Sequence, residues 1–314
     1  MRAVVLDQTG LHVTDRPAPS PRPGEVRVRV LKAGLCETDL QLVRGYMGFQ
    51  GILGHEFVGI AESGALSGQR VVGEINCACG HCDYCRRGLQ THCPSRSVLG
   101  ILNHDGAFAE FVCVPERNLH RVPDNVTDDQ AVFTEPLAAA FQIPEQVPLQ
   151  ADQRVIVLGD GRLGNLCAQV IMQSRCRLTV VGKHDAKLDL LARLGIETAR
   201  VDTTELERQA DIVIDCTGSA TGLDTALKLL KPRGTLVLKT TVAGTQTLSL
   251  APLVIDEITV VGSRCGPFAP ALAALRDGRI QVEPLIEATY PLADAVAAFE
   301  RATTRPTLKL LLKP

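Results

Sequence analysis

Apolar and polar residues alternate with a period of two in several segments early in the chain. Segment 25–31 (EVRVRVL) shows this pattern directly after the turn-forming residues PSPRPG, and segments 55–62 (HEFVGIAE) and 69–75 (QRVVGEI) repeat it. Such alternation is typical of strands that bury one face. It predicts an antiparallel β domain in the first part of the chain.

The pattern changes near residue 135, where the alanine-rich segment 135–143 (EPLAAAFQI) indicates a helix. Short apolar runs then alternate with segments of helical periodicity: strands are predicted at 155–158, 178–182, 211–218, 235–239 and 257–263, and helices after residue 164 and at 187–195 and 221–230. This alternation predicts a parallel, doubly wound α/β sheet with right-handed crossovers. After residue 266 we expect helices at 271–278 and 293–302, an extended segment at 282–292 and a final apolar segment at 308–312.

A GxGxxG motif lies between the first of these strands and its helix, formed by Gly159, Asp160, Gly161, Arg162, Leu163 and Gly164. The first glycine permits a sharp turn, the second lets backbone amides approach a pyrophosphate, and the third brings the helix close to the strand. The phosphates then lie at the positive end of the helix. The motif alone is weak, but its position between strand and helix predicts a dinucleotide site.

The end of the second strand bears on the choice of nucleotide. An acidic residue there would bind the ribose hydroxyl of NAD, but the chain has Gly182, Lys183 and His184. Without that negative charge, and with Lys183 able to pair with a 2′-phosphate, we hypothesise that NADP(H) is favoured over NAD(H). The alternative is that Lys183 is a solvated lysine and that Asp185 binds the ribose.

Length and composition favour a globular protein of two domains. The chain has 314 residues, of which 45% are hydrophobic and 22% charged, and a formal net charge of -2. This charge gives no electrostatic reason to expect nucleic acid as a partner. No apolar run approaches the roughly 20 residues of a membrane span, and MRAVVLDQTG lacks the features of a secretory signal. We therefore expect a cytoplasmic location.

Five of the 11 cysteines lie in the segment 77–93, CACGHCDYCRRGLQTHC. Cytosolic thiols are kept reduced, so a dense cluster there indicates a metal site rather than disulfides. Four thiolates on one loop can surround zinc without an open position, which defines a structural site. The expected ligands are Cys79, Cys82, Cys85 and Cys93. The alternative is a set of free thiols; Cys77 is interpreted as a lone thiol, and His81 and His92 as solvated residues.

Four residues outside this lobe each have an ordinary explanation when taken alone. Cys36 fits a core position, and Glu135 fits the start of a helix. His55 fits a hydrogen-bonded position on a strand, next to Glu56 in the GHE segment. In order along the chain, however, AGLCETDL, GHEFVG, the cysteine lobe, EPLA, GDGRLG and DCTGS resemble the zinc-dependent medium-chain alcohol dehydrogenase family. The resemblance covers essentially the whole chain and points to the sorbitol or polyol dehydrogenase and threonine dehydrogenase-like branch.

The resemblance implies a fold and a set of cofactors. It implies a β-rich, GroES-like catalytic domain at 1–137 with the zinc lobe at 77–93, a Rossmann domain at 138–265, and a return to the catalytic domain at 266–314. It further implies two zinc ions per chain, a small alcohol or carbonyl substrate, no nucleic-acid or membrane partner, and assembly as a homodimer or homotetramer.

The resemblance also assigns roles to individual residues. Cys36 and His55 match catalytic zinc ligands, Glu135 matches the third ligand, and Glu56 matches a carboxylate that coordinates the ion or sits just behind it. Three ligands leave one position open, where zinc eases loss of the alcohol proton so that hydride can pass to the nicotinamide. Thr38 matches the hydroxyl that relays this proton, and Asp39 an aspartate behind the zinc ligands.

Further matches concern the cofactor. Cys216 and Thr217 of DCTGS match nucleotide contacts, and Lys309 loosely matches a basic residue that contacts phosphate. Two departures stand out: Gln41 replaces a histidine that ends the proton relay in many relatives, and Glu37 carries a charge that we expect to point away from the pyrophosphate.

Two other functions compete with a dehydrogenase. One is a nucleotide-binding protein of the same fold without turnover, or a quinone reductase-like member. The other is a nucleic-acid zinc module, which the absence of a basic surface disfavours.

Overall fold

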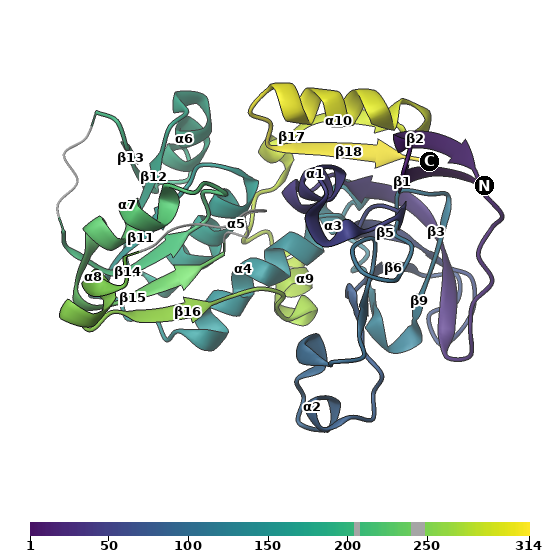
Figure 1. The fold of residues 1–314 in the computed structure, drawn as a ribbon, viewed down its shortest axis with the longest axis horizontal. Helices are drawn as coiled ribbons and strands as arrows, with labels where there is room; N and C mark the ends of the chain where they lie inside the picture. The colour runs from purple at the N-terminus through teal and green to yellow at the C-terminus, as the bar shows by residue number, and fades with distance from the viewer. Residues whose placement is uncertain (204–207, 240–248) are drawn as a thin grey trace. The chain divides into compact units, whose positions relative to one another are not determined.

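The computed structural model describes residues 1–203, 208–239 and 249–314 (Figure 1). Its contacts divide the chain into two compact units. The terminal unit comprises Met1–Glu135 and Phe268–Pro314, and the central unit comprises Pro136–Pro267. These bounds lie close to the expected boundaries at 137 and 265.

A seven-stranded sheet forms the terminal unit's main layer. Six strands follow the order β10 (Leu119–Arg121), β6 (Arg70–Gly73), β5 (Glu56–Ala61), β3 (Glu25–Gly34), β18 (Lys309–Lys313) and β17 (Ile286–Pro291), and β9 (Phe111–Pro115) pairs with β3. The three period-two segments are thus confirmed as β3, β5 and β6. The last strand of the chain, β18, lies inside the sheet, between β3 and β17.

The strands of the first part of the chain pair antiparallel, as predicted, whereas two strands from its last part do not pair with each other in this way. Strands β17 and β18 pair in parallel, because the helix α10 (Ala295–Thr304) carries the chain back across the sheet between them. The sequence reading also missed a three-stranded sheet of β2 (Gly10–Asp15), β1 (Arg2–Asp7) and β4 (Gly51–Ile52).

The central unit confirms the predicted doubly wound sheet. Its strands are all parallel, in the order β13 (Glu197–Arg200), β12 (Arg177–Gly182), β11 (Arg154–Leu158), β14 (Ala210–Asp215), β15 (Leu230–Leu238) and β16 (Thr259–Gly262). The helices are α4 (Thr134–Gln146), α5 (Arg162–Ile171), α6 (Asp185–Ala192), α7 (Gly222–Leu229) and α8 (Ala251–Ile255). The order reverses between β11 and β14, so ligands are expected beyond the carboxyl ends of these strands.

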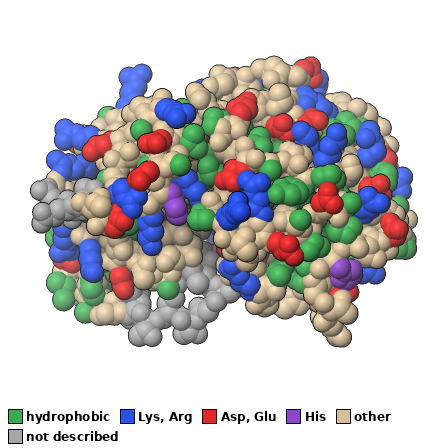
Figure 2. Space-filling view, turned by 90° about the horizontal axis from the view of Figure 1, so that it is seen from above, with side chains coloured by type: hydrophobic (Ala, Val, Ile, Leu, Met, Phe, Trp, Pro, Cys, Tyr) green, Lys and Arg blue, Asp and Glu red, His purple; other side chains and the backbone are tan. Residues whose placement is uncertain are grey.

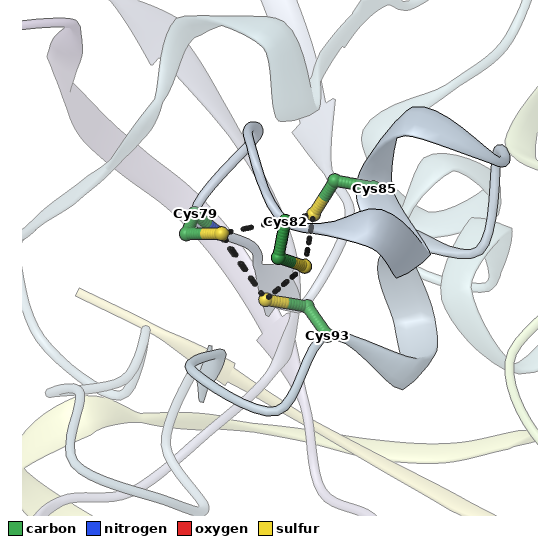
Figure 3. Close-up of side chains that lie close together, drawn as sticks. All are labelled: Cys79, Cys82, Cys85 and Cys93. Carbon is green, nitrogen blue, oxygen red and sulfur yellow. Dashed lines mark hydrogen bonds between the residues drawn. The ribbon is translucent and has the colours of Figure 1, made fainter.

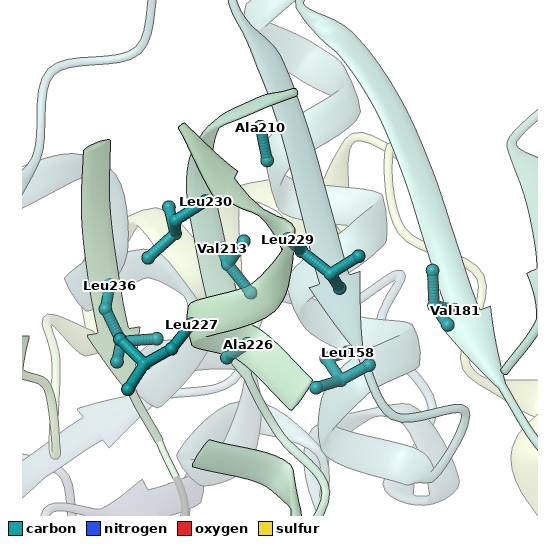
Figure 4. Close-up of a cluster of buried hydrophobic side chains, with 9 residues drawn as sticks. All are labelled: Leu158, Val181, Ala210, Val213, Ala226, Leu227, Leu229, Leu230 and Leu236. Atoms are coloured by element: carbon teal, nitrogen blue, oxygen red, sulfur yellow. The ribbon is translucent and has the colours of Figure 1, made fainter. Parts of the chain in front are cut away.

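Apolar side chains of α7 pack on one face of this sheet (Figure 4). Ala226, Leu227 and Leu229 of the helix join Val213 and Leu236 of the strands in one buried cluster. Helical spacing places these residues on the side of α7 that faces the sheet. This packing holds the carboxyl ends of the strands, where the nucleotide motif lies, on a rigid layer.

The remaining α-helices and strands lie in the terminal unit. They are α1 (Glu37–Val43), α2 (Asp83–Arg86), α3 (Asp128–Ala131), α9 (Phe268–Arg276) and the short hairpin of β7 (Asn76–Cys77) and β8 (Ser97–Val98). Within the described residues, no helix combines the length and apolar character that crossing a bilayer requires. Acidic and basic side chains are interspersed over the face that Figure 2 draws.

Candidate metal centres and nucleotide site

The structure brings the four predicted cysteines of the lobe together. Cys82 caps the N-terminus of α2, Cys85 lies within that helix, and Cys79 and Cys93 approach from the loops on either side. Their sulfur atoms point toward one another (Figure 3). Gly80 and Gly88, at φ +85° and +75°, provide the left-handed turns that fold the loop around the cluster.

The distances between these sulfur atoms match a tetrahedral zinc site. Four Sγ–Sγ distances are 3.9 Å (Cys79–Cys85), 3.5 Å (Cys82–Cys85), 3.8 Å (Cys82–Cys93) and 3.6 Å (Cys93–Cys79). Zn–S bonds of about 2.3 Å in tetrahedral geometry would separate the sulfurs by about 3.8 Å. The residues present therefore fit a structural zinc with no position left for substrate.

Backbone amides favour a thiolate within this group. The N–H groups of His81 and Cys82 lower the pKa of the Cys79 thiol to about 6. Cys77 differs, since burial raises the pKa of its thiol to about 11 and it lies outside the group. His81 and His92 are both exposed. These positions agree with the interpretation of Cys77 as a lone thiol.

A second group of possible metal ligands lies where β3, α1 and β5 meet. Cys36 caps the N-terminus of α1 directly after β3, His55 precedes β5, and Glu56 begins that strand. One ligand atom from each lies within 4.8 Å of the others. Gly54, at φ +97°, turns the chain against Phe108 just before His55, at a position where any side chain would clash.

Asp39 connects two members of this group. Its Oδ2 accepts a 2.8 Å hydrogen bond from the backbone N–H of Cys36, and its Oδ1 lies 3.3 Å from Nδ1 of His55. Burial disfavours the imidazolium of His55, but Asp39 and Cys36 outweigh burial and raise the pKa of His55 well above its usual range. With Nδ1 turned to Asp39, Nε2 is left to face a metal.

Glu56 shares its carboxylate with a buried lysine. Its Oε2 forms an ion pair with Nζ of Lys309, and both side chains are 0% exposed. Its Oε1 is buried without a hydrogen-bond partner among the described residues. The Lys309 ammonium also lies 5.4 Å from the ring centroid of Phe133 and 3.4 Å from the carbonyl oxygen of Leu35.

This donor set fits zinc. A thiol, an imidazole and a carboxylate are the ligand types of catalytic zinc sites, and three ligands leave a position open. The orphaned Oε1 of Glu56 supports a metal nearby, since buried carboxylate oxygens normally have a partner. Glu135 is half-buried and outside the group within 4.8 Å, so its role as a ligand stays a prediction.

Two residues of α1, Thr38 and Glu37, follow Cys36 and differ in where their side chains lie. The hydroxyl of Thr38 is 3.9 Å from Sγ of Cys36, which places it beside the group. Glu37 is exposed, accepts a hydrogen bond from Gln41 and lies 3.8 Å from Arg44. Its charge is therefore engaged along the surface of α1.

The three glycines of the nucleotide motif differ in the space around them. Gly159, at φ +116°, lies so close to Cys216 that an added Cβ would be 2.8 Å from its carbonyl oxygen. An added Cβ on Gly164 would clash with the Gly159 carbonyl, whereas one on Gly161 would meet nothing within 4 Å. Gly161 also caps α5, which begins with Arg162 and Leu163. Open space thus remains where an anion would approach the helix N-terminus.

The other expected cofactor residues fall in two places. Cys216 donates its backbone N–H to Leu158, and Thr217 bonds to Asp215 through both N–H and hydroxyl, so both lie at the carboxyl end of β14. Lys309 lies instead in the terminal unit, fully buried against Glu56. A phosphate contact by Lys309 stays a prediction, and the burial of its ammonium weighs against it.

Sequence reasoning missed the interaction of Lys309 with Glu56. The two residues are 253 positions apart, and no local pattern relates them. The glycine that makes room for the pair was missed as well: an added Cβ on Gly34 would be 2.6 Å from Oε2 of Glu56. A lysine within the apolar segment LKLLL was the one available signal, because a lysine inside a buried strand needs a counter-charge.

Comparisons with known proteins identify the family of the chain. Residues 22–124 match the family described as "Alcohol dehydrogenase GroES-like domain", and residues 163–276 match "Zinc-binding dehydrogenase". The chain is 29% identical over 342 residues to a sorbitol dehydrogenase of Halalkalibacterium halodurans, covering 100% of this chain and 99% of the relative. It is 34% identical over 245 residues to an L-threonine 3-dehydrogenase of Rhizobium etli. That match covers 73% of this chain and 69% of the relative.

A solved structure gives the same result. An alcohol dehydrogenase of Escherichia coli CFT073, complexed with NADH, matches with a TM-score of 0.91 and 26% identity, covering 100% of this chain and 99% of that chain. The sorbitol dehydrogenase relative and this solved structure each cover the whole chain. The chain belongs to the zinc-dependent medium-chain alcohol dehydrogenase superfamily and is an oxidoreductase of that family.

Proposed function

We propose that this protein is a zinc-dependent dehydrogenase that transfers hydride between an alcohol or polyol, or the corresponding ketone or aldehyde, and a nicotinamide cofactor. The carrying observation is the group of Cys36, His55 and Glu56, whose ligand atoms lie within 4.8 Å of one another. A noncatalytic nucleotide-binding protein has no use for such a group beside a relay hydroxyl. The sorbitol and threonine dehydrogenase relatives support a hydroxyl-bearing substrate.

Zinc in this centre would supply the Lewis acidity that alcohol oxidation and carbonyl reduction need. The protein's own side chains would orient the zinc ligands and transfer the substrate's hydroxyl proton. Asp39 fixes the imidazole of His55 and the backbone at Cys36. The hydroxyl of Thr38 both accepts and donates, so it can take the substrate proton while passing on its own. Gln41 is not a base and donates its side-chain amide to Glu37, so it would not end a proton relay.

We propose NADP(H) as the preferred cofactor. At the carboxyl end of β12 the chain presents Gly182, an exposed Lys183 and a half-buried His184. Lys183 supplies a positive charge for a 2′-phosphate, and no carboxylate follows the strand directly to receive a ribose hydroxyl. The ratio of kcat/KM for NADP+ and NAD+ tests this choice: a ratio well below one would reject it.

Metal analysis and two variants test the catalytic role. The purified protein should contain about two zinc ions per chain, one for each centre. Cys36→Ser and His55→Ala should each lose one zinc and nearly all alcohol oxidation while retaining nucleotide binding. Cys77→Ser, a buried cysteine outside both groups, serves as the matched control and should keep both zinc ions and full activity.

Each contrary outcome points to a specific alternative. Full activity in Cys36→Ser and His55→Ala would reject zinc catalysis. Binding of NADPH without turnover of primary alcohols, secondary alcohols, polyols or amino alcohols would favour the noncatalytic or quinone reductase-like alternative. The cytoplasmic location stays a prediction, supported by the need of the lobe thiols for a reducing compartment.

We also propose that the protein forms a homodimer, or a tetramer of such dimers, through the edge strand β16. Among the described residues this strand pairs with β15 alone, and its other edge has no strand partner within them. Exposed apolar side chains gather beside it: Leu250, Val254 and Ile255 are 62%, 75% and 77% exposed and Val260 is 43% exposed. A strand edge flanked by apolar residues suits a second copy related by a twofold axis.

A further inference from the structure

Asp160, the second residue of the nucleotide motif, directs its side chain to the loop that follows β12. Its Oδ2 accepts hydrogen bonds from the backbone N–H groups of Lys183 (2.6 Å) and His184 (2.7 Å). Its two oxygens also lie 3.0 and 3.1 Å from Nδ1 of His184. The carboxylate thus bonds to three donors of the loop that follows β12.

The side chain of Asp160 is almost fully enclosed by this arrangement. It is 8% exposed, whereas that of His184 is 42% exposed. Burial raises the pKa of Asp160, but the His184 ring and the two N–H groups outweigh burial and hold the pKa below its usual range. An ionised carboxylate only accepts, so Nδ1 of His184 must carry the proton, and Nε2 is left for another partner.

The same carboxylate explains why the second strand ends in glycine. An added Cβ on Gly182 would be 2.5 Å from Oδ2 and 2.6 Å from Cβ of Asp160. No side chain fits at residue 182 while Asp160 occupies this volume, and a second carboxylate there would also meet like charge. Asp160 therefore excludes an acidic side chain at residue 182.

In the described part of the chain, Asp185, Arg200 and Asp202 are charged neighbours of the loop, and Lys183 also interacts electrostatically with Asp202. Arg200, on the neighbouring strand β13, is engaged by Asp185 and Asp202. The side chain of Lys183 is exposed. The backbone N–H groups of Lys183 and His184 are both held by hydrogen bonds to Asp160. A long lysine side chain loses less entropy on binding an anion when its backbone is already held.

We propose that Asp160 is a positioning residue for cofactor choice, which holds the loop after β12 so that Lys183 and Nε2 of His184 meet the 2′-phosphate of NADP(H). This inference rests on the proposed NADP(H) preference and deepens it. Asp160 acts through the loop and does not itself contact the phosphate.

The test compares two nucleotide fragments that differ by one phosphate, 2′,5′-ADP and 5′-AMP. Their dissociation constants are measured by calorimetry on the wild type and its variants at one fixed ionic strength. We expect the wild type to bind 2′,5′-ADP about tenfold more tightly or better, since each hydrogen bond to a charged group contributes on that scale. Asp160→Ala should reduce this advantage to about twofold, chiefly by weakening 2′,5′-ADP.

Two further variants separate positioning from folding. Asp160→Asn keeps an oxygen acceptor for the backbone N–H groups and should give an intermediate ratio. Asp211→Ala is the matched control, because Asp211 also accepts a backbone N–H, from Arg154 at 2.8 Å, but at the opposite end of the sheet. It should lower thermal stability without changing the ratio of the two constants.

The outcomes distinguish the two proposals. A wild type that binds both fragments equally overturns the NADP(H) preference. A wild type that prefers 2′,5′-ADP, with an unchanged ratio in a folded Asp160→Ala or Asp160→Asn, overturns the role of Asp160 and leaves the cofactor preference standing. A ratio that rises in these variants also overturns it, because Asp160 would then repel the phosphate.

Discussion

Gly34 lies opposite Glu56 in the pairing of β3 with β5, and a methyl group there would come 2.6 Å from the Glu56 carboxylate and 2.7 Å from Val132. We expect Gly34→Ala to displace this carboxylate from Lys309, with a loss of stability of about 1–3 kcal/mol and reduced zinc at the Cys36 centre. Thermal unfolding and metal analysis measure both effects. Gly262→Ala, where a Cβ meets nothing within 4 Å, should change neither.

Asp39 gives a second prediction at the scale of one residue. Asp39→Asn keeps an oxygen for the Cys36 N–H but loses the charge that orients His55. We expect zinc affinity at this centre to fall about 10- to 100-fold. Competition with a chromogenic chelator measures the affinity. An unchanged affinity would mean that the buried carboxylate has no influence on the ligand.

The residues themselves were enough to predict a site only where its ligands lie close together in the chain; Cys36, His55 and Glu56 were named through the family resemblance. The spacing of Cys79, Cys82, Cys85 and Cys93 was enough to name a zinc lobe, because one loop supplies all four ligands. The partner of Glu56 could not be found in this way, since Lys309 reaches it through sheet pairing across 253 positions. The contact between Asp160 and the β12 loop depends likewise on the parallel pairing of β11 with β12.

At the scale of elements, the zinc lobe should behave as a separate unit of stability. Its own apolar cluster consists of Ala78 and the four cysteines, so a bound zinc would take the place of a hydrophobic core there. We expect Cys82→Ser to release one zinc and to raise amide hydrogen exchange throughout 77–93. Exchange in β11 and β12 should stay at the wild-type level; a global increase would show that the lobe supports the whole fold.

Element prediction succeeded where the hydrophobic period was strong and failed where pairing decided the outcome. The alternating segment at β3 and the apolar run at β11 each identified their strand. Strand β13 (ETAR) is four residues long and half-buried to exposed, so it has no apolar run to mark it. The parallel pairing of β17 with β18 follows from the path of α10, which no local pattern encodes.

At the scale of the whole molecule, the edge strand β16 predicts a concentration-dependent assembly. Ile255→Glu places a charge on a side chain that is 77% exposed in the single chain. Burying such a residue in an interface contributes about 1.5–3 kcal/mol, so the variant should shift the mass measured by light scattering toward one chain. Met172→Glu, at a 38% exposed residue elsewhere in the central unit, should leave the mass unchanged.

The place of β18 inside the seven-stranded sheet sets an order for folding during translation. The central unit is complete once Pro267 has left the ribosome, so it can fold on the nascent chain. Until β18 emerges, Ala33 and Gly34 of β3 lack their strand partner, β17 has no neighbour in the sheet, and Glu56 lacks its ammonium partner. A premature stop codon ahead of Lys309 would thus remove an inner strand of the sheet and not a dispensable tail. The truncated protein would expose the unpaired strand edges of an incomplete sheet to chaperones.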